Sequence, residues 1–176
     1  MITVSQDTLH SALNAVTRAS TKSTLMAAFS LVRLDVNTNG ILHLSCFNGE
    51  TAARSTVNVD CNEDMSVCVD AATLKAVVET LSGQIRLHVD ETSLVIQGTS
   101  NRTTLRIVEE PLPVIGDEQI QSVATISGNI FRSLMRALPF ASTDDSRAVL
   151  QVIHLILDSD SVIAQTADGY SAGVAR

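Results

Sequence analysis

The sequence has 176 residues, of which 45% are hydrophobic and 3% aromatic, and its formal net charge is −7. This length fits one large domain or one and a half small ones, and the hydrophobic content is enough for a core. No apolar run approaches the roughly 18 residues of a membrane span, and the N-terminal residues lack a secretory pattern, so we expect a cytoplasmic protein. The acidic balance and few aromatic side chains disfavour a generic nucleic-acid binder, unless basic residues gather on one face.

The first third of the chain predicts a strand, a helix and three further strands. Leu9, Leu13 and Val16 recur at helical spacing, and Ser5 or Asp7 could cap this helix. Alternating segments follow, with turn residues between them. The expected elements are a strand over 2–5, a helix over 7–19, and strands over 29–36, 41–47 and 52–59.

The same order of elements recurs twice more, as a repetition of pattern with low sequence identity. In the second copy, Ile85, Leu87 and Val89 alternate and are expected to face inward. In the third copy, Pro139 should end the helix. The expected second copy has a strand over 66–69, a helix over 71–81, and strands over 84–89, 93–97 and 102–108. The expected third copy has a strand over 123–126, a helix over 129–138, and strands over 148–157, 161–166 and 171–175.

The order of these elements and three segments resemble the bacterial DNA polymerase III β subunit family, the DNA sliding clamps. Residues 9–16 are similar to the family's first helix. Lys22-Ser23-Thr24-Leu25 falls where the family usually has Arg-Pro-Thr-Leu-Pro, and Thr166-Ala167-Asp168-Gly169-Tyr170 falls on the family's Ala-Thr-Asp-Gly-His. The resemblance covers essentially the whole chain, as the first domain and the first half of the second.

This resemblance implies the α+β DNA-clamp fold, with helices on one face of antiparallel sheets. It implies a clamp domain over 1–115 with two repeats, a linker over 116–121, and half of a second clamp domain over 122–176 with one repeat. A family chain has six such repeats and this chain has three, so it is either a piece of a longer clamp or a short relative. The sequence leaves both open.

The resemblance also implies a ring that encircles duplex DNA without sequence preference and tethers the replicative polymerase, without an active site. Polymerase and clamp-loader subunits dock short peptides in a family pocket. Its nearest remnants here would be Thr166, Asp168, Gly169 and Tyr170. Tyr170-Ser171-Ala172 replaces the family's His-Arg-Leu, so we expect peptide binding to be weak or absent. The alternative is a clamp-fold interaction scaffold that no longer encircles DNA.

Basic residues concentrate in the helical segments. Segments 7–22, 71–81 and 127–138 carry five basic residues against two acidic ones, a net charge of +3, which leaves −10 for the rest of the chain. Phosphate contacts supply non-specific DNA affinity, so this asymmetry favours DNA-facing helices, although solvated basic residues on helices are common. The DNA-binding candidates are Arg18, Lys22, Lys75, Arg132, Arg136 and Arg147.

Local context separates these candidates. Arg132 and Arg136 are four residues apart and share one helix face. Arg18 and Lys22 end the first helix, where cations also stabilise the helix C-terminus. Arg147 follows the third helix, beside two aspartates that weaken its case.

The sequence shows no pattern for catalysis or for a metal site. The histidines have no metal-ligand spacing, and the cysteines form no Cys-x-x-Cys pair and are expected to be free thiols. Phosphate-binding glycine loops and a Gly-x-Ser-x-Gly motif are absent. We therefore expect a protein without catalytic activity, metal or cofactor. The residues concerned are His10, His43, His88 and His154, and Cys46, Cys61 and Cys68.

The third repeat has no partner repeat in this sequence, so half of a domain core should be exposed. Val149, Val152, Leu155 and Leu157 would leave apolar surface and open strand edges. We therefore expect self-association. Two copies could pair through the third repeat about a two-fold axis, and two such dimers could close a tetrameric ring of twelve repeats.

Overall fold

The computed structural model describes residues 1–22, 26–109, 112 and 125–176. The chain divides into two compact units, Met1–Gly116 and Asp117–Arg176, which we call the N-terminal unit and the C-terminal unit. The expected linker over 116–121 lies outside the described residues, as do Ser23, Thr24 and Leu25. None of the helices in the described part of the chain is long and apolar enough to cross a membrane.

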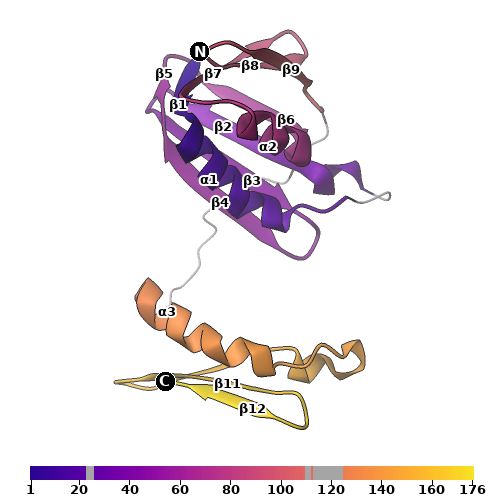
Figure 1. Ribbon diagram of the computed structural model, residues 1–176, viewed down its shortest axis with the longest axis vertical. Coiled ribbons are helices and arrows are strands. Elements are labelled where there is room, and N and C mark those ends of the chain that lie inside the picture. Colours follow the sequence, from indigo (N-terminus) through magenta and orange to yellow (C-terminus); the bar gives the residue numbers. More distant parts are fainter. Residues whose placement is uncertain (23–25, 110–111, 113–124) are drawn as a thin grey trace. The chain divides into compact units, whose positions relative to one another are not determined.

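The N-terminal unit contains two successive repeats of strand, helix and three strands (Figure 1). The first repeat consists of β1 (Ile2–Ser5), α1 (Gln6–Val16), the 3-10 helices η1 (Thr17–Ala19) and η2 (Ala27–Ser30), β2 (Leu31–Asn37), β3 (Ile41–Phe47), β4 (Ala52–Asn58) and the short β5 (Asp60–Cys61). The second repeat consists of β6 (Met65–Asp70), α2 (Ala71–Glu79), β7 (Gln84–Asp90), β8 (Ser93–Gln97) and β9 (Arg102–Arg106).

The first strand of each repeat lies in the sheet of the other repeat. One sheet has the order β4-β3-β2-β6 and the other β5-β1-β7-β8-β9, and all pairs are antiparallel. Val36 of the first repeat pairs with Met65 of the second, and Ile2 pairs with Leu87. Each repeat thus covers an otherwise open strand edge of the other, which removes a site for unwanted strand pairing.

The two helices lie side by side over a core to which both repeats contribute (Figure 1). Leu9 and Leu13 of α1 are fully buried together with Leu74 and Val78 of α2. Burying such a side chain stabilises the fold by about 1.5–3 kcal/mol, so a repeat that lost its neighbour would lose much of its stabilisation.

The C-terminal unit contains one helical segment on a three-stranded sheet with the order β10-β11-β12 (Figure 1). Its buried core is small and is built on Leu134, Ala137 and Ala164. Its elements are α3 (Gly128–Leu134), the 3-10 helices η3 (Met135–Phe140) and η4 (Asp145–Leu150), β10 (His154–Leu157), β11 (Val162–Ala167) and β12 (Ala172–Ala175).

The third repeat departs most from the sequence expectation. Of the strand expected over 123–126, residues 125 and 126 are not in a strand and the other two lie outside the described residues. The strand expected over 148–157 forms only over His154–Leu157, and a 3-10 helix occupies Asp145–Leu150. The equivalent strands β2 and β7 have seven residues each and are paired on both edges, whereas β10 pairs only with β11. Without a second neighbour, fewer residues are held in the ladder.

The third helix was also expected to be longer. Its α-helical part ends at Leu134 and continues as a 3-10 helix to Phe140, so the helix over 129–138 is wrong in type after Leu134. Pro139 lies inside this 3-10 helix, where it was expected to end the α-helix. A proline ring obstructs the preceding α-helical turn, and the tighter 3-10 path is a common way for helices to end.

Smaller differences concern the N-terminal unit. Ser5, not Asp7, caps α1, since its side chain accepts a hydrogen bond from the backbone of Thr8. Val89 is exposed although the alternation predicted an inward position, because the sheet core beneath β7 ends at Leu87. The expected helices over 7–19 and 71–81 are α-helical over Gln6–Val16 and Ala71–Glu79.

One residue of the stretch read as a polar connection is buried. Leu112 packs with Leu31 and Cys68 on the outer side of the β4-β3-β2-β6 sheet. Arg33 Nη1 donates a hydrogen bond of 3.2 Å to the Leu112 carbonyl oxygen. Leu112 therefore belongs to the packed N-terminal unit.

Candidate nucleic-acid interface

The three helices that carry most of the candidate basic residues begin in the same way. The side chains of Ser5, Asp70 and Ser127 accept hydrogen bonds of 3.2, 2.8 and 3.3 Å from the backbone N–H three residues further on. Such N-caps satisfy a backbone donor that the helix leaves unpaired. Because the caps are equivalent, residues of the three helices can be compared by their distance from the cap.

Three candidates lie on the helical side of the N-terminal unit. Arg18 in η1 and Lys22 are exposed and follow the end of α1. Lys75 on α2 lies 4.0 Å from the Glu79 carboxylate, which also contacts the His10 ring of α1 at 3.3 Å. The charge of Lys75 is therefore partly countered at the line where α1 and α2 meet, which we call the helix seam.

Arg132 and Arg136 in the C-terminal unit are both exposed on the α3–η3 segment. Arg132 Nη1 donates a hydrogen bond of 3.3 Å to Asn129 Oδ1. Among the residues that the structure describes, neither arginine has a carboxylate within ion-pair distance. These two side chains are thus open to an external anion, and their spacing places both on one face.

Arg147 belongs to a different site from the other candidates. It lies in η4, where its Nε is 3.9 Å from Asp144 Oδ2. A Cβ atom at Gly169 would lie 3.1 Å from Arg147 Nη1, so the guanidinium group lies over the turn between β11 and β12. The expectation that grouped Arg147 with Arg132 and Arg136 stays a prediction, because it rests on proximity in sequence.

The residues predicted as remnants of a peptide pocket lie in and beside the same turn. Asp168 accepts hydrogen bonds from the backbone of Tyr170 and Ser171, and these bonds lower the pKa of its carboxyl group. Gly169 adopts a positive φ of 94°, which favours glycine. Tyr170 is 95% exposed. Thr166, in contrast, is buried and donates to the Ala137 carbonyl oxygen at 2.6 Å, so the four residues do not share one lining.

The residues with redox or metal-binding potential are dispersed. No group of three or more histidine, cysteine or acidic side chains that could hold a metal ion occurs among the described residues. All three cysteines are free, and burial raises the pKa of the Cys46 thiol to about 12. Cys46 therefore stays protonated at neutral pH.

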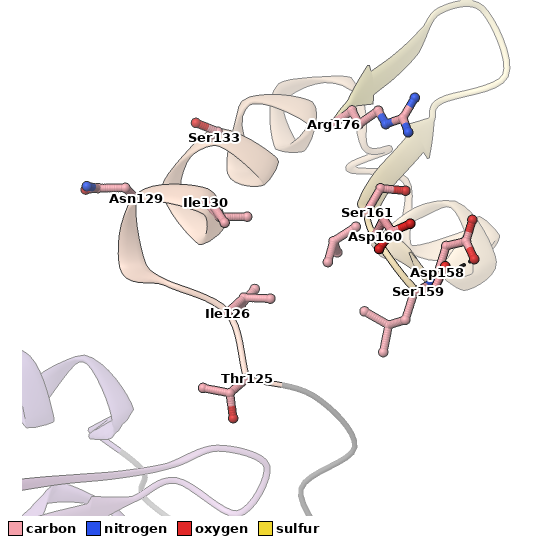
Figure 2. A pocket seen from close by; sticks show the side chains of 12 residues that line it. Thr125, Ile126, Asn129, Ile130, Ser133, Asp158, Ser159, Asp160, Ser161 and Arg176 are labelled. Atoms are coloured by element: carbon pink, nitrogen blue, oxygen red, sulfur yellow. Dashed lines mark hydrogen bonds between the residues drawn. The ribbon is translucent and has the colours of Figure 1, made fainter.

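The sequence analysis did not predict an open pocket of about 650 Å³ in the C-terminal unit. Figure 2 shows Ile126 and Ile130 on the side of α3, across from the turn that carries Asp158 and Asp160. The residue before the cap is fully or almost fully buried in the N-terminal unit, but Ile126 at this position is only partly buried. The pocket opens where the core of this unit is incomplete.

The described geometry defines a class of protein: α+β repeats, with a capped helix against an antiparallel sheet, that share a core two at a time. The same fold is found in solved sliding clamps. The clamp from Caulobacter crescentus superposes with a TM-score of 0.82 at 20% identity, that from Pseudomonas aeruginosa with 0.80 at 22%, and that from Bacillus subtilis with 0.83 at 14%. These matches cover 98–99% of this chain and 48–49% of the clamp chains.

A sequence match accompanies the structural one. The chain is 26% identical over 138 residues to the β sliding clamp of Streptomyces coelicolor, which covers 77% of this chain and 36% of that protein. No family model matches the sequence. Sequence and fold together support a member of the DNA polymerase III β sliding-clamp family. The chain spans about half the length of the solved clamps that it matches.

Proposed function

We propose that this chain acts as a DNA sliding clamp, or as a part of one, that holds duplex DNA without sequence preference and tethers a DNA polymerase. The observation that carries this proposal is the pair Arg132 and Arg136. Both are exposed, both lie on one face of a helical segment, and neither has a carboxylate partner among the described residues. Arg18, Lys22 and Lys75 add positive charge on the helices of the N-terminal unit.

The chemistry of such a site is electrostatic. Guanidinium groups that contact phosphate oxygens release counterions from DNA, which gives affinity without reading the bases. The proposed contribution of the chain to synthesis is to raise the effective concentration of the polymerase at the primer end. This role needs no reacting side chain, metal or cofactor.

A charge-reversal experiment tests the DNA contact. Arg132→Glu with Arg136→Glu should weaken binding to a duplex of about 30 base pairs and leave the far-UV circular dichroism unchanged. Each phosphate contact removed should lower the salt slope of binding by roughly 0.9. A matched control is Arg86→Gln with Arg102→Gln, two exposed arginines on the β-strands of the N-terminal unit. Equal affinity of the helix variant and the wild type at low salt would contradict the proposal.

A topological experiment separates a clamp from an interaction scaffold. A protein that encircles DNA is retained on a nicked circular duplex and is lost when the circle is made linear. Equal retention on both forms would support the scaffold alternative. We also expect weak or absent binding of clamp-motif peptides in calorimetry, because Thr166 is buried away from Tyr170 and Tyr170-Ser171-Ala172 replaces the family segment.

A further inference from the structure

The α3 segment exposes side chains whose equivalents are buried in the N-terminal unit. Four residues after the cap, Leu9 and Leu74 are 0% exposed, whereas Phe131 is 48% exposed. Eleven residues after the cap, Leu138 is 52% exposed. Val16 and Leu81, at that second position in the other helices, are buried. In the N-terminal unit the two repeats cover these positions together, so the same face of α3 is uncovered.

The sheet of the C-terminal unit has a matching open edge. β2 and β7, the first strands after each helix of the N-terminal unit, are each covered by the leading strand of the other repeat. β10 is their equivalent and, within the described residues, pairs only with β11. All four residues of β10 are exposed, among them Leu155, Ile156 and Leu157. The open pocket beside Ile126 lies next to this incomplete core.

We propose that the C-terminal unit pairs with the C-terminal unit of a second copy of this chain about a two-fold axis. The N-terminal unit shows what covers such a face, because two repeats of this architecture pack against each other there and exchange their leading strands. A second copy presents the same face and the same strand edge. The contact is self-complementary, which is the requirement for an isologous dimer.

This pairing has an unusual charge arrangement at its helix seam. In the N-terminal unit, His10 lies five residues after its cap and contacts Glu79, which lies nine residues after the other cap, at 3.3 Å. The same two positions in the C-terminal unit hold Arg132 and Arg136. The dimer would therefore place Arg132 of each copy beside Arg136 of the other, so that four arginines line the seam. Such like charges repel one another, and salt screens the repulsion.

The dimer should therefore become tighter as salt concentration rises, because burial of the apolar face favours it and the arginines oppose it. Phosphate groups would relieve the same repulsion. On the proposed function, on which this clause rests, duplex DNA and dimer formation should favour each other, since the coupling between two binding equilibria is reciprocal.

Sedimentation equilibrium of the 176-residue chain at 25 and 300 mM NaCl tests the pairing. We expect a dimer whose Kd falls at least threefold at the higher salt. Arg132→Gln with Arg136→Gln should tighten the dimer at low salt and abolish this dependence, whereas the control Arg86→Gln with Arg102→Gln should behave as wild type. A monomer at 100 µM in 300 mM NaCl would overturn the pairing. A dimer that weakens with salt would overturn the arginine seam.

Two substitutions locate the contact. Phe131→Arg should raise the dimer Kd more than tenfold, and Leu138→Lys provides a second test should the first variant fail to fold. A dimer unchanged by a folded variant of either kind would overturn the assigned face.

A duplex of about 30 base pairs then separates this inference from the proposed function. Tightening of the wild-type dimer by the duplex, lost in the double glutamine variant, would support both. A salt-strengthened dimer that ignores the duplex would support pairing and contradict DNA binding. Duplex binding by a monomer would support the function and overturn the pairing.

Discussion

Leu9→Ala should lower the stability of the N-terminal unit by about 3 kcal/mol. Leu9 is fully buried in the core that both repeats build. Leucine-to-alanine changes at such sites cost about 2–5 kcal/mol, because transfer free energy is lost and a cavity remains. With a urea m-value of about 1.5–2 kcal/mol per molar, the unfolding midpoint should fall by about 1.5–2 M.

The structure offers a matched control at the equivalent position of the third repeat. Phe131→Ala removes a larger side chain, but Phe131 is half exposed in the C-terminal unit. At a protein concentration too low for self-association, this change should alter the unfolding free energy of its unit by no more than about 1 kcal/mol. The contrast tests whether a neighbouring repeat, and not helix propensity, makes this position important.

The assay has to distinguish the two units. The chain has no tryptophan, and its one tyrosine, Tyr170, lies in the C-terminal unit, so fluorescence would not follow the N-terminal unit. Hydrogen exchange measured by mass spectrometry across a urea series reports on each unit through its own peptides, with β3 as the reporter for Leu9→Ala. A midpoint shift below about 0.5 M, or equal effects of both changes, would refute the shared-core argument.

Three further outcomes are expected. Asp70→Ala should cost the N-terminal unit about 1 kcal/mol in urea unfolding, because Asp70 accepts the Thr73 N–H at 2.8 Å, and unaltered unfolding would show that this cap is dispensable. The backbone bonds to Asp168 lower the pKa of its carboxyl group, so its support of the β11–β12 turn should be present above its ordinary pKa of 3.8 and be lost as pH falls through the lowered value. Amide NMR shifts of Ser171 should follow this loss in wild type but not in Asp168→Asn, and identical titrations would contradict the assignment. Cys46, whose thiol pKa is raised to about 12, should resist thiol reagents at pH 8 until urea unfolds its unit, and rapid labelling in buffer would contradict its burial.

The periodic and capped segments of the fold could be predicted from the sequence. The spacing of Leu9, Leu13 and Val16 indicated α1, and all three residues are buried. Turn residues at Gly40 and Gly49 separated the strands, and both glycines have positive φ. These features depend on contacts between near neighbours in the chain, which a sequence pattern records directly.

Features that depend on a distant neighbour were not predictable in the same way. The exchange of β1 and β6 between sheets leaves no local pattern, because an edge strand and a paired strand can have the same alternation. The shortened β10 has the same cause, since its residues have the apolar composition of a strand but only one pairing partner. Of the candidate site, Arg132 and Arg136 could be placed on one face from their spacing. The contact of Arg147 with the turn at Gly169 could not.

The exchanged strands constrain how the N-terminal unit can be made. Ile2 is among the first residues to leave the ribosome, yet its partner Leu87 in β7 follows only after the whole first repeat has been synthesised. Pairings between residues so far apart in the chain raise the contact order and slow folding. The first repeat must therefore remain incomplete during synthesis, with the β1 segment waiting for the second repeat, and a pause in translation before β7 would prolong the exposure of an aggregation-prone edge.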